Sequence, residues 1–122
     1  MTADDFIEQV SRVRARFAST LSGKIADSFA DLEKMSDGGG DAIETVTATH
    51  CRLHKMYGIA QTLGFPATGQ AAGAARTAIR EAAKAKRAAT PAETVALKTE
   101  LERLRVAATG ELQNFRERVS EP

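Results

Sequence analysis

Two histidines, His50 and His54, stand one helical turn apart and are the residues of this chain best suited to chemistry. A neutral imidazole is both a nucleophile and a metal ligand near neutral pH. Gly58 follows His54 by one further turn, although glycine costs about 1 kcal/mol against alanine inside a helix. The pattern suggests either covalent chemistry at a ring nitrogen that a partner can reach, or metal binding by the histidine pair.

Metal binding is the weaker of these two interpretations. His50 and His54 at i and i+4 could share a metal ion, but the glutamate of an HExxH motif is missing. Cys51 points to another side of the helix, and we expect it to be a small packed or half-exposed residue. The chain has no other cysteine and no third histidine. The glycines at 38–40 lack the lysine and the strand of a phosphate loop. We therefore predict no metal and no cofactor.

Length and composition indicate one domain, residues 1–122. The net charge of +1 argues against a general nucleic-acid binder. The single cysteine excludes an internal disulfide and fits a reducing compartment. No apolar run approaches the length that spans a bilayer, and the first residues are acidic, unlike a signal peptide. We expect a cytoplasmic protein that binds neither membrane nor nucleic acid.

Helical periodicity runs along the whole chain, and strand alternation is nearly absent. Apolar residues recur at steps of three or four in the first and last segments, which is typical of amphipathic helices. The expected core stripes are Phe6, Val10, Val13, Phe17, Leu21, Ile25, Phe29 and Leu32 in the first segment, and Val95, Leu97, Leu101, Leu104, Ala108, Leu112 and Phe115 in the last. Both stripes should face a common core.

Breaks and caps divide the chain into helices. Ser22-Gly23 predicts a break that splits the first segment into two helices, and Ser36-Asp37 with the glycines at 38–40 ends the second. Asp41 is expected to be the N-cap of the histidine helix, with Glu44 completing a capping box. That helix should end at 63–66, where glycine and proline follow. Thr90 and the proline after it should start the last helix.

Between these two helices, residues 67–87 should form one alanine-rich helix. Small residues at Ala71, Ala72, Gly73, Ala74, Ala75 and Ala78 would let it pack closely. The fold class that we predict is therefore all-α: an antiparallel four-helix bundle with an additional N-terminal helix.

Helical geometry places His54 away from the core. At 100° per residue, Val46, Leu53, Met56 and Ala60 cluster in one sector that should be buried. His54 lies roughly 120° from that sector, on the side of Gly58 and Gln61. His50 lies nearer the core boundary. Gly58 could serve close helix packing, but its outward direction favours a site that a partner protein approaches.

The segment from His54 to Phe65 resembles the H-x-x-K-G-x-A-x-x-x-G-F signature of histidine phosphotransfer domains, especially those at the N-terminus of chemotaxis histidine kinases. The matching positions are His54, Gly58, Ala60, Gly64 and Phe65. The resemblance implies a carrier without kinase activity of its own. It accepts a phosphoryl group on Nε2 of His54 and exchanges it with the aspartate of a response-regulator receiver domain, which supplies the magnesium.

The resemblance also implies roles for neighbouring residues. His54 would be the phosphoryl acceptor, and Gly58, Tyr57, Gln61 and Lys55 would provide docking and access, with apolar contacts from Met56 and Ile59. Tyr57 stands where the family has lysine. Arg76 stands where the chemotaxis kinases have a glutamate that binds the imidazole, and it is a candidate for stabilising the phosphoryl group.

The partners that follow are a receiver domain and, as a second donor, a histidine kinase, with the carrier itself a monomer. The basic run at 76–87 would steer an acidic receiver towards His54, although an ordinary solvated face explains it equally well. The alternative function is a helical module related to these domains that binds a partner without carrying phosphate.

Overall fold

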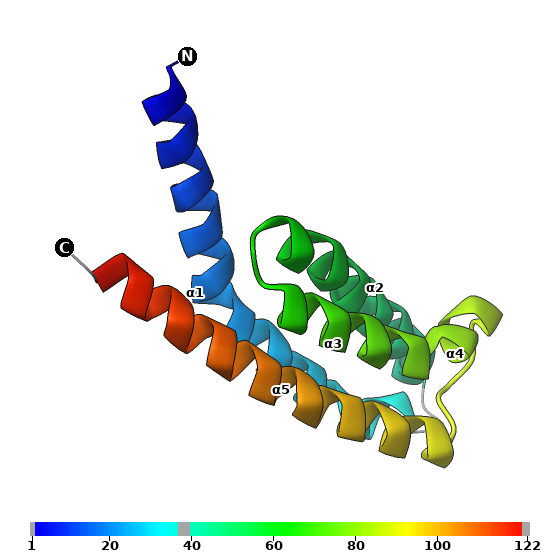
Figure 1. Ribbon diagram of the computed structural model, residues 1–122. Coiled ribbons are helices and arrows are strands. Elements are labelled where there is room, and N and C mark those ends of the chain that lie inside the picture. Colours follow the sequence, from blue (N-terminus) through cyan, green and yellow to red (C-terminus); the bar gives the residue numbers. More distant parts are fainter. Residues whose placement is uncertain (1, 37–39, 121–122) are drawn as a thin grey trace.

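The computed structural model describes residues 2–36 and 40–120, and the elements that it contains over these ranges are all helices (Figure 1). They are α1 (Ala3–Met35), α2 (Asp41–Thr62), α3 (Pro66–Ala78), α4 (Arg80–Ala85) and α5 (Pro91–Ser120). The predicted all-α class is confirmed. Among the described helices, none is long and apolar enough to cross a membrane.

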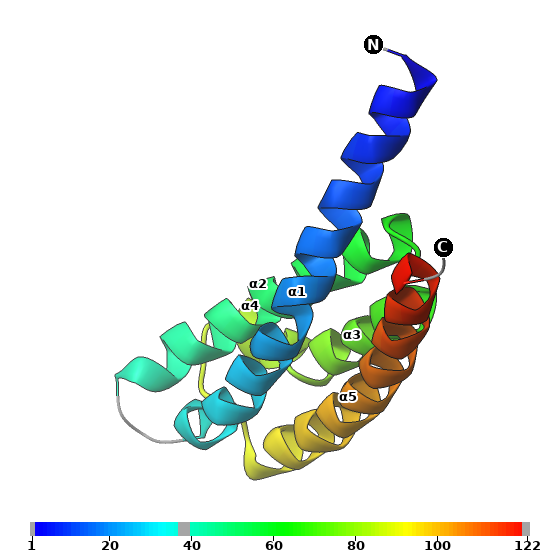
Figure 2. The ribbon, with the colours of Figure 1, turned by 90° about the vertical axis from the view of Figure 1, so that its left-hand side faces the viewer.

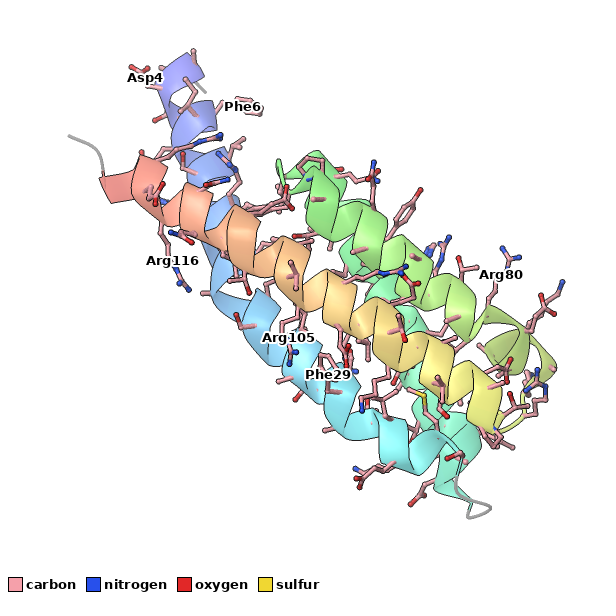
Figure 3. All side chains as sticks on the ribbon, turned by 60° about the horizontal axis from the view of Figure 1, so that its bottom comes forward. Asp4, Phe6, Phe29, Arg80, Arg105 and Arg116 are labelled. Atoms are coloured by element: carbon pink, nitrogen blue, oxygen red, sulfur yellow. The ribbon has the colours of Figure 1, made fainter. Side chains whose placement is uncertain are left out.

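Four long helices enclose one apolar core. α3 packs against α2 and α5, α1 packs against the same two helices, and the short α4 lies on α2 and α3 (Figures 1 and 2). Figure 3 shows Arg105 of α5 beside Phe29 of α1, and the guanidinium carbon lies 5.0 Å from the ring centroid. The largest fully buried apolar side chains are Phe65, Leu21, Met35, Leu53, Ile79, Leu97, Leu101, Leu104 and Val46.

The first segment is one helix and not two. α1 runs without interruption through Ser22-Gly23, so the predicted break is wrong. A reciprocal pair of hydrogen bonds between Thr2 and Asp5 caps its first turn. A glycine weakens a helix by only about 1 kcal/mol, and the buried residues on both sides of Gly23, Leu21 and Ile25, hold the helix against its neighbours.

The N-terminal turns of α1 project beyond the other helices (Figures 1 and 2). Phe6, Val10 and Val13, predicted as core, are therefore 59%, 36% and 49% exposed. The first buried residue of α1 is Phe17, whose ring centroid lies 5.3 Å from that of Phe65. On α5, Val95 is also exposed, contrary to prediction, while the other predicted residues of its stripe are buried or half-buried.

Residues 67–87 form two helices where we predicted one. α3 ends at Ala78, and the backbone N–H of Ile79 donates to the carbonyl oxygens of Arg76 and Thr77. The side chain of Ile79 is fully buried there. The change of direction places Ile79 in the core, and no glycine or proline marks it in the sequence. α4 then ends at Ala85, and its C-cap residue Lys86 has a left-handed backbone with φ of 54°.

The helix starts were predicted with mixed success. α2 begins at Asp41 itself and Gly40 is its N-cap, so the expected capping role of Asp41 is wrong; no side chain caps this helix. The predicted start of α5 is confirmed, because Thr90 and Glu93 exchange side-chain to backbone hydrogen bonds of 2.9 and 3.1 Å. The breaker before α2 lies partly at residues 37–39, outside the described ranges.

The end of α2 is confirmed and ties three helices together. Gly64 adopts φ of 88°, a conformation that glycine tolerates best. Phe65 then enters the core, with its ring centroid 5.3 Å from that of Phe17 and 5.7 Å from that of Phe115. Arg14 of α1 donates from Nε to the carbonyl oxygen of Leu63 at 2.8 Å. This end of the histidine helix is therefore fixed in position.

Candidate functional site

His54 lies on the outer side of α2, as helical geometry predicted. The four predicted core residues of this helix, Val46, Leu53, Met56 and Ala60, are all buried. His54 is exposed, and Gly58 one turn later is exposed as well. A Cβ atom added to Gly58 would meet nothing within 4 Å. Gly58 is therefore not required for helix packing, and it leaves open space on the side of His54 towards the end of α2.

Arg76 of α3 reaches the imidazole directly. Its Nη1 lies 2.8 Å from Nδ1 of His54. All nitrogens of a guanidinium group donate and none accepts, so Nδ1 is the acceptor of this hydrogen bond. The sequence placed Arg76 beside the site by its resemblance to the chemotaxis kinases, and the structure brings the two side chains into contact.

Tyr57 stands where the family signature has lysine, but its side chain is not fully exposed. It is half-buried between α2 and α3. The guanidinium carbon of Arg76 lies 4.9 Å from its ring centroid, which is a cation–π contact. Tyr57 thus supports the side chain that binds His54, and it contributes to the site through Arg76.

Two glycines on α3 make room for these side chains. A Cβ atom at Gly73 would lie 2.7 Å from Cδ2 of Tyr57, and one at Gly69 would lie 2.6 Å from Cγ of Gln61. Both distances are too short for a real contact, so neither position accommodates a side chain without movement. Close packing was predicted for Gly73 but not for Gly69. The signal available in the sequence was their spacing of four, which puts both on one face of α3.

His50 is half-buried and faces cations. Burial lowers the pKa of His50 from its ordinary value, and the charge of Arg76 and the proximity of His54 and Arg80 lower it further. Nε2 of His50 and Nε of Arg76 are both buried and lack a hydrogen-bond partner among the described residues. His50 is therefore less readily protonated than an ordinary histidine, and it lacks the exposure of His54.

Metal ligands do not gather at the histidines. No group of three or more histidine, cysteine or carboxylate side chains within residues 2–36 and 40–120 is arranged to hold a metal ion. Cys51 is exposed, more than we expected.

The remaining predicted site residues differ in their access to a partner. Lys55 and Gln61 are exposed, and Gln61 lies against Gly69 of α3. Ile59 is 44% exposed. Met56 is only 2% exposed, so the expectation that it contacts a partner is wrong; its side chain belongs to the core sector of α2.

The basic run at 76–87 is partly engaged within the protein. Arg87 binds Glu93 through two hydrogen bonds of 2.7 and 3.1 Å, and this lowers the pKa of the Glu93 carboxyl to about 2. Arg80, Lys84 and Lys86 are the other basic residues of the run beyond Arg76, and all three are exposed. Figure 3 shows Arg80 pointing outward from the helices. Cations of this run thus remain available at the surface near the end of α3.

Comparison of the chain with protein-family models, with curated proteins and with solved structures gave no match.

Proposed function

We propose that this protein is a phosphoryl carrier of the histidine phosphotransfer type. His54 accepts a phosphoryl group on Nε2 and exchanges it with the aspartate of a receiver domain in a cytoplasmic phosphorelay. The observation that carries the proposal is an exposed histidine with a glycine one turn later, where the space around the glycine is open. An imidazole offered in this way suits attack on a phosphorus atom held by another protein.

The fold supports the proposal in its arrangement of long helices. We infer that α1, α2, α3 and α5 form an antiparallel four-helix bundle, because each packs against two others around one core. The site then lies on one side of the bundle, on α2 and α3, where a second protein has access. The chain needs no kinase activity, because the receiver supplies the metal ion and the acidic groups of the reaction.

The cation that the family signature places at position 57 comes from α3 in this protein. Arg76 is stacked on Tyr57 and lies within hydrogen-bond distance of His54. The charge near the acceptor is therefore retained, although it is carried by another helix. A cation close to a transferred phosphoryl group offsets its negative charge, which is the role proposed for Arg76.

Docking would involve the exposed residues around His54. Gly58 leaves room for the receiver surface, Ile59 offers an apolar contact, and Lys55 and Gln61 line the approach. The exposed cations Arg80 and Lys86 attract an acidic receiver pocket over a range of about 8–10 Å at ordinary ionic strength. These contacts explain how a small helical protein selects an acidic partner.

The test uses two phosphoryl donors of different size. Purified protein is incubated with a phosphorylated receiver domain, and separately with the small donor phosphoramidate. Acid-labile, base-stable label should appear with both donors, persist in His50→Gln and disappear in His54→Gln. Gly58→Gln should slow transfer from the receiver by roughly tenfold or more and leave labelling by phosphoramidate unchanged, because only the protein donor needs the open space.

The matched control for Gly58→Gln is Gly23→Gln, since Gly23 is also a helical glycine with nothing within 4 Å. Its transfer rate should equal that of the unsubstituted protein. Label that remains in His54→Gln, or that never appears with any donor, contradicts the carrier function.

A binding module that carries no phosphate is the second candidate. The observation that favours it is the engagement of the His54 ring by Arg76, together with the absence of lysine at position 57. Complex formation with a receiver domain in the absence of any label on His54 would support this candidate.

A further inference from the structure

The contact between Arg76 and His54 determines which ring nitrogen carries the proton. Nη1 of Arg76 donates to Nδ1 of His54 at 2.8 Å. A neutral imidazole has one N–H group and one lone pair. Since the lone pair of Nδ1 accepts from Arg76, the proton of the neutral ring lies on Nε2. A proton on Nδ1 and this hydrogen bond exclude each other.

Arg76 is held in this position from two sides. Its guanidinium lies over the ring of Tyr57 at 4.9 Å, and that ring lies against Gly73, where an added Cβ atom would be only 2.7 Å from Cδ2 of the ring. Besides burial, the charges of Arg76 of α3 and Arg80 of α4 lower the pKa of the neighbouring His50, and Lys55 is the next residue of α2. At Nδ1 of His54 itself, the hydrogen-bond donor is Nη1 of Arg76.

We propose, on the premise that His54 is a phosphoryl carrier, that Arg76 is a positioning residue that keeps Nδ1 of His54 unprotonated in both the free and the phosphorylated histidine. In the free histidine the proton is on Nε2. In the phosphorylated histidine Nε2 is bonded to phosphorus and Nδ1 still accepts from Arg76. The guanidinium therefore matches the phosphorylated ring without any change of partner.

Uptake of the phosphoryl group then releases one proton. For the attack, the proton of the neutral ring moves through solvent from Nε2 to Nδ1 while Arg76 releases Nδ1, so that the lone pair of Nε2 becomes free. That lone pair forms the N–P bond, and the P–O bond to the receiver aspartate breaks to leave a carboxylate. Nδ1 then gives its proton to solvent and accepts from Arg76 again. The reverse transfer takes one proton up. Where the ring is neutral, each unit of pH should shift the equilibrium about tenfold towards phosphorylated His54.

Loss of the phosphoryl group becomes slow for the same reason. Imidazole leaves phosphorus most readily when Nδ1 is protonated, because the departing group is then neutral. Arg76 occupies the lone pair that this proton would use. The phosphorylated form should therefore be long-lived, and the protein should store its phosphoryl group until a receiver accepts it.

Nitrogen NMR of the imidazole tests the assignment without any phosphorylation. In protein labelled with ¹⁵N, at a pH where the ring is neutral, Nδ1 of His54 should give the shift of an unprotonated nitrogen and Nε2 that of an N–H nitrogen. Arg76→Glu should reverse the two, because a carboxylate accepts from Nδ1–H. Lys98→Glu, the same charge change at an exposed position on α5, should leave them unchanged. A proton on Nδ1 in the unsubstituted protein overturns the proposal.

The lifetime of phosphorylated His54 tests the consequence. After loading with phosphoramidate and removal of the donor, loss of label should be about fivefold faster or more in Arg76→Glu and close to normal in Arg76→Lys, which keeps a donor. Equal lifetimes in all three proteins overturn the storage role. If phosphoramidate never labels His54, the carrier function fails and the storage role with it, while the NMR result still decides the tautomer.

Discussion

The N-terminal turns of α1 and the contact between α2 and α3 are both built on residues that repeat at steps of three and four. On α1, Phe6 and Val13 stay 59% and 49% exposed, whereas Leu53 of α2 and Ala72 of α3 are fully buried. The helical pattern is the same in both regions. The difference is that α2 and α3 face each other along their length, while the first turns of α1 face no other helix (Figure 2). Periodicity defines a face, and only a neighbouring element buries it.

Glycines show the same contrast. A Cβ atom added to Gly23 of α1 would meet nothing within 4 Å, whereas one at Gly69 of α3 would lie 3.3 Å from both the backbone nitrogen of Gln61 and the carbonyl oxygen of Tyr57. At Gly69 the backbones of α2 and α3 approach so closely that a Cβ atom would require α2 to shift by a few tenths of an ångström. Gly23 has no such role, and its cost to the helix is not offset by packing.

The largest expected effect is a difference in stability between alanine variants of two phenylalanines, Phe65 and Phe6. Phe65→Ala should lower the free energy of unfolding by about 3–5 kcal/mol, because Phe65 is buried between the rings of Phe17 and Phe115. Phe6→Ala should change it by less than about 0.5 kcal/mol, as is usual for surface substitutions. Urea unfolding followed by circular dichroism measures both. A large loss in Phe6→Ala would show that the first turns of α1 are covered in solution.

Alanine substitution of the two glycines should change stability by smaller amounts, and the two changes should be opposite in sign to each other. Gly69→Ala should destabilise the protein by about 1–3 kcal/mol through overpacking against α2. Gly23→Ala should stabilise it by about 0.5–1 kcal/mol, since alanine is the better helix former and finds free space. Thermal unfolding of the two variants beside the unsubstituted protein gives both values. A Gly69→Ala variant as stable as Gly23→Ala would mean that α2 and α3 do not approach closely.

The smallest effect concerns pH and is confined to the α2–α3 region, because the N-terminal turns of α1 contain no histidine. Burial and the charge of Arg76 lower the pKa of His50 below its ordinary 6.5. As the pH falls, His50 in the unfolded chain therefore takes up a proton at a higher pH than His50 in the folded protein does. The stability that is present above pH 6.5 is lost as the pH falls below this value. Unfolding measured across this range should show the loss, and His50→Gln should lack it. An identical pH profile in both proteins would contradict the lowered pKa of His50.

Local rules predicted the parts of the fold that depend on neighbouring residues. The start of α5 at Thr90 and the end of α2 at Gly64 follow from capping and from backbone preference, and both are present. The buried side of α2 followed from its periodicity. The continuity of α1 and the break at Ile79 were not predicted, because packing of Leu21, Ile25 and Ile79 into the core outweighs the weak preferences of single residues.

The sequence by itself determined that the chain is helical, that His54 points away from the core of α2, and that Gly58 leaves its side open. These are consequences of helix geometry, which acts over a few residues. Only the tertiary structure decided that Arg76 binds Nδ1 of His54, a residue 22 positions away, and that Tyr57 supports Arg76 in the space left by Gly73. Such contacts depend on the distance between α2 and α3, and that distance is set by side-chain packing over the whole interface.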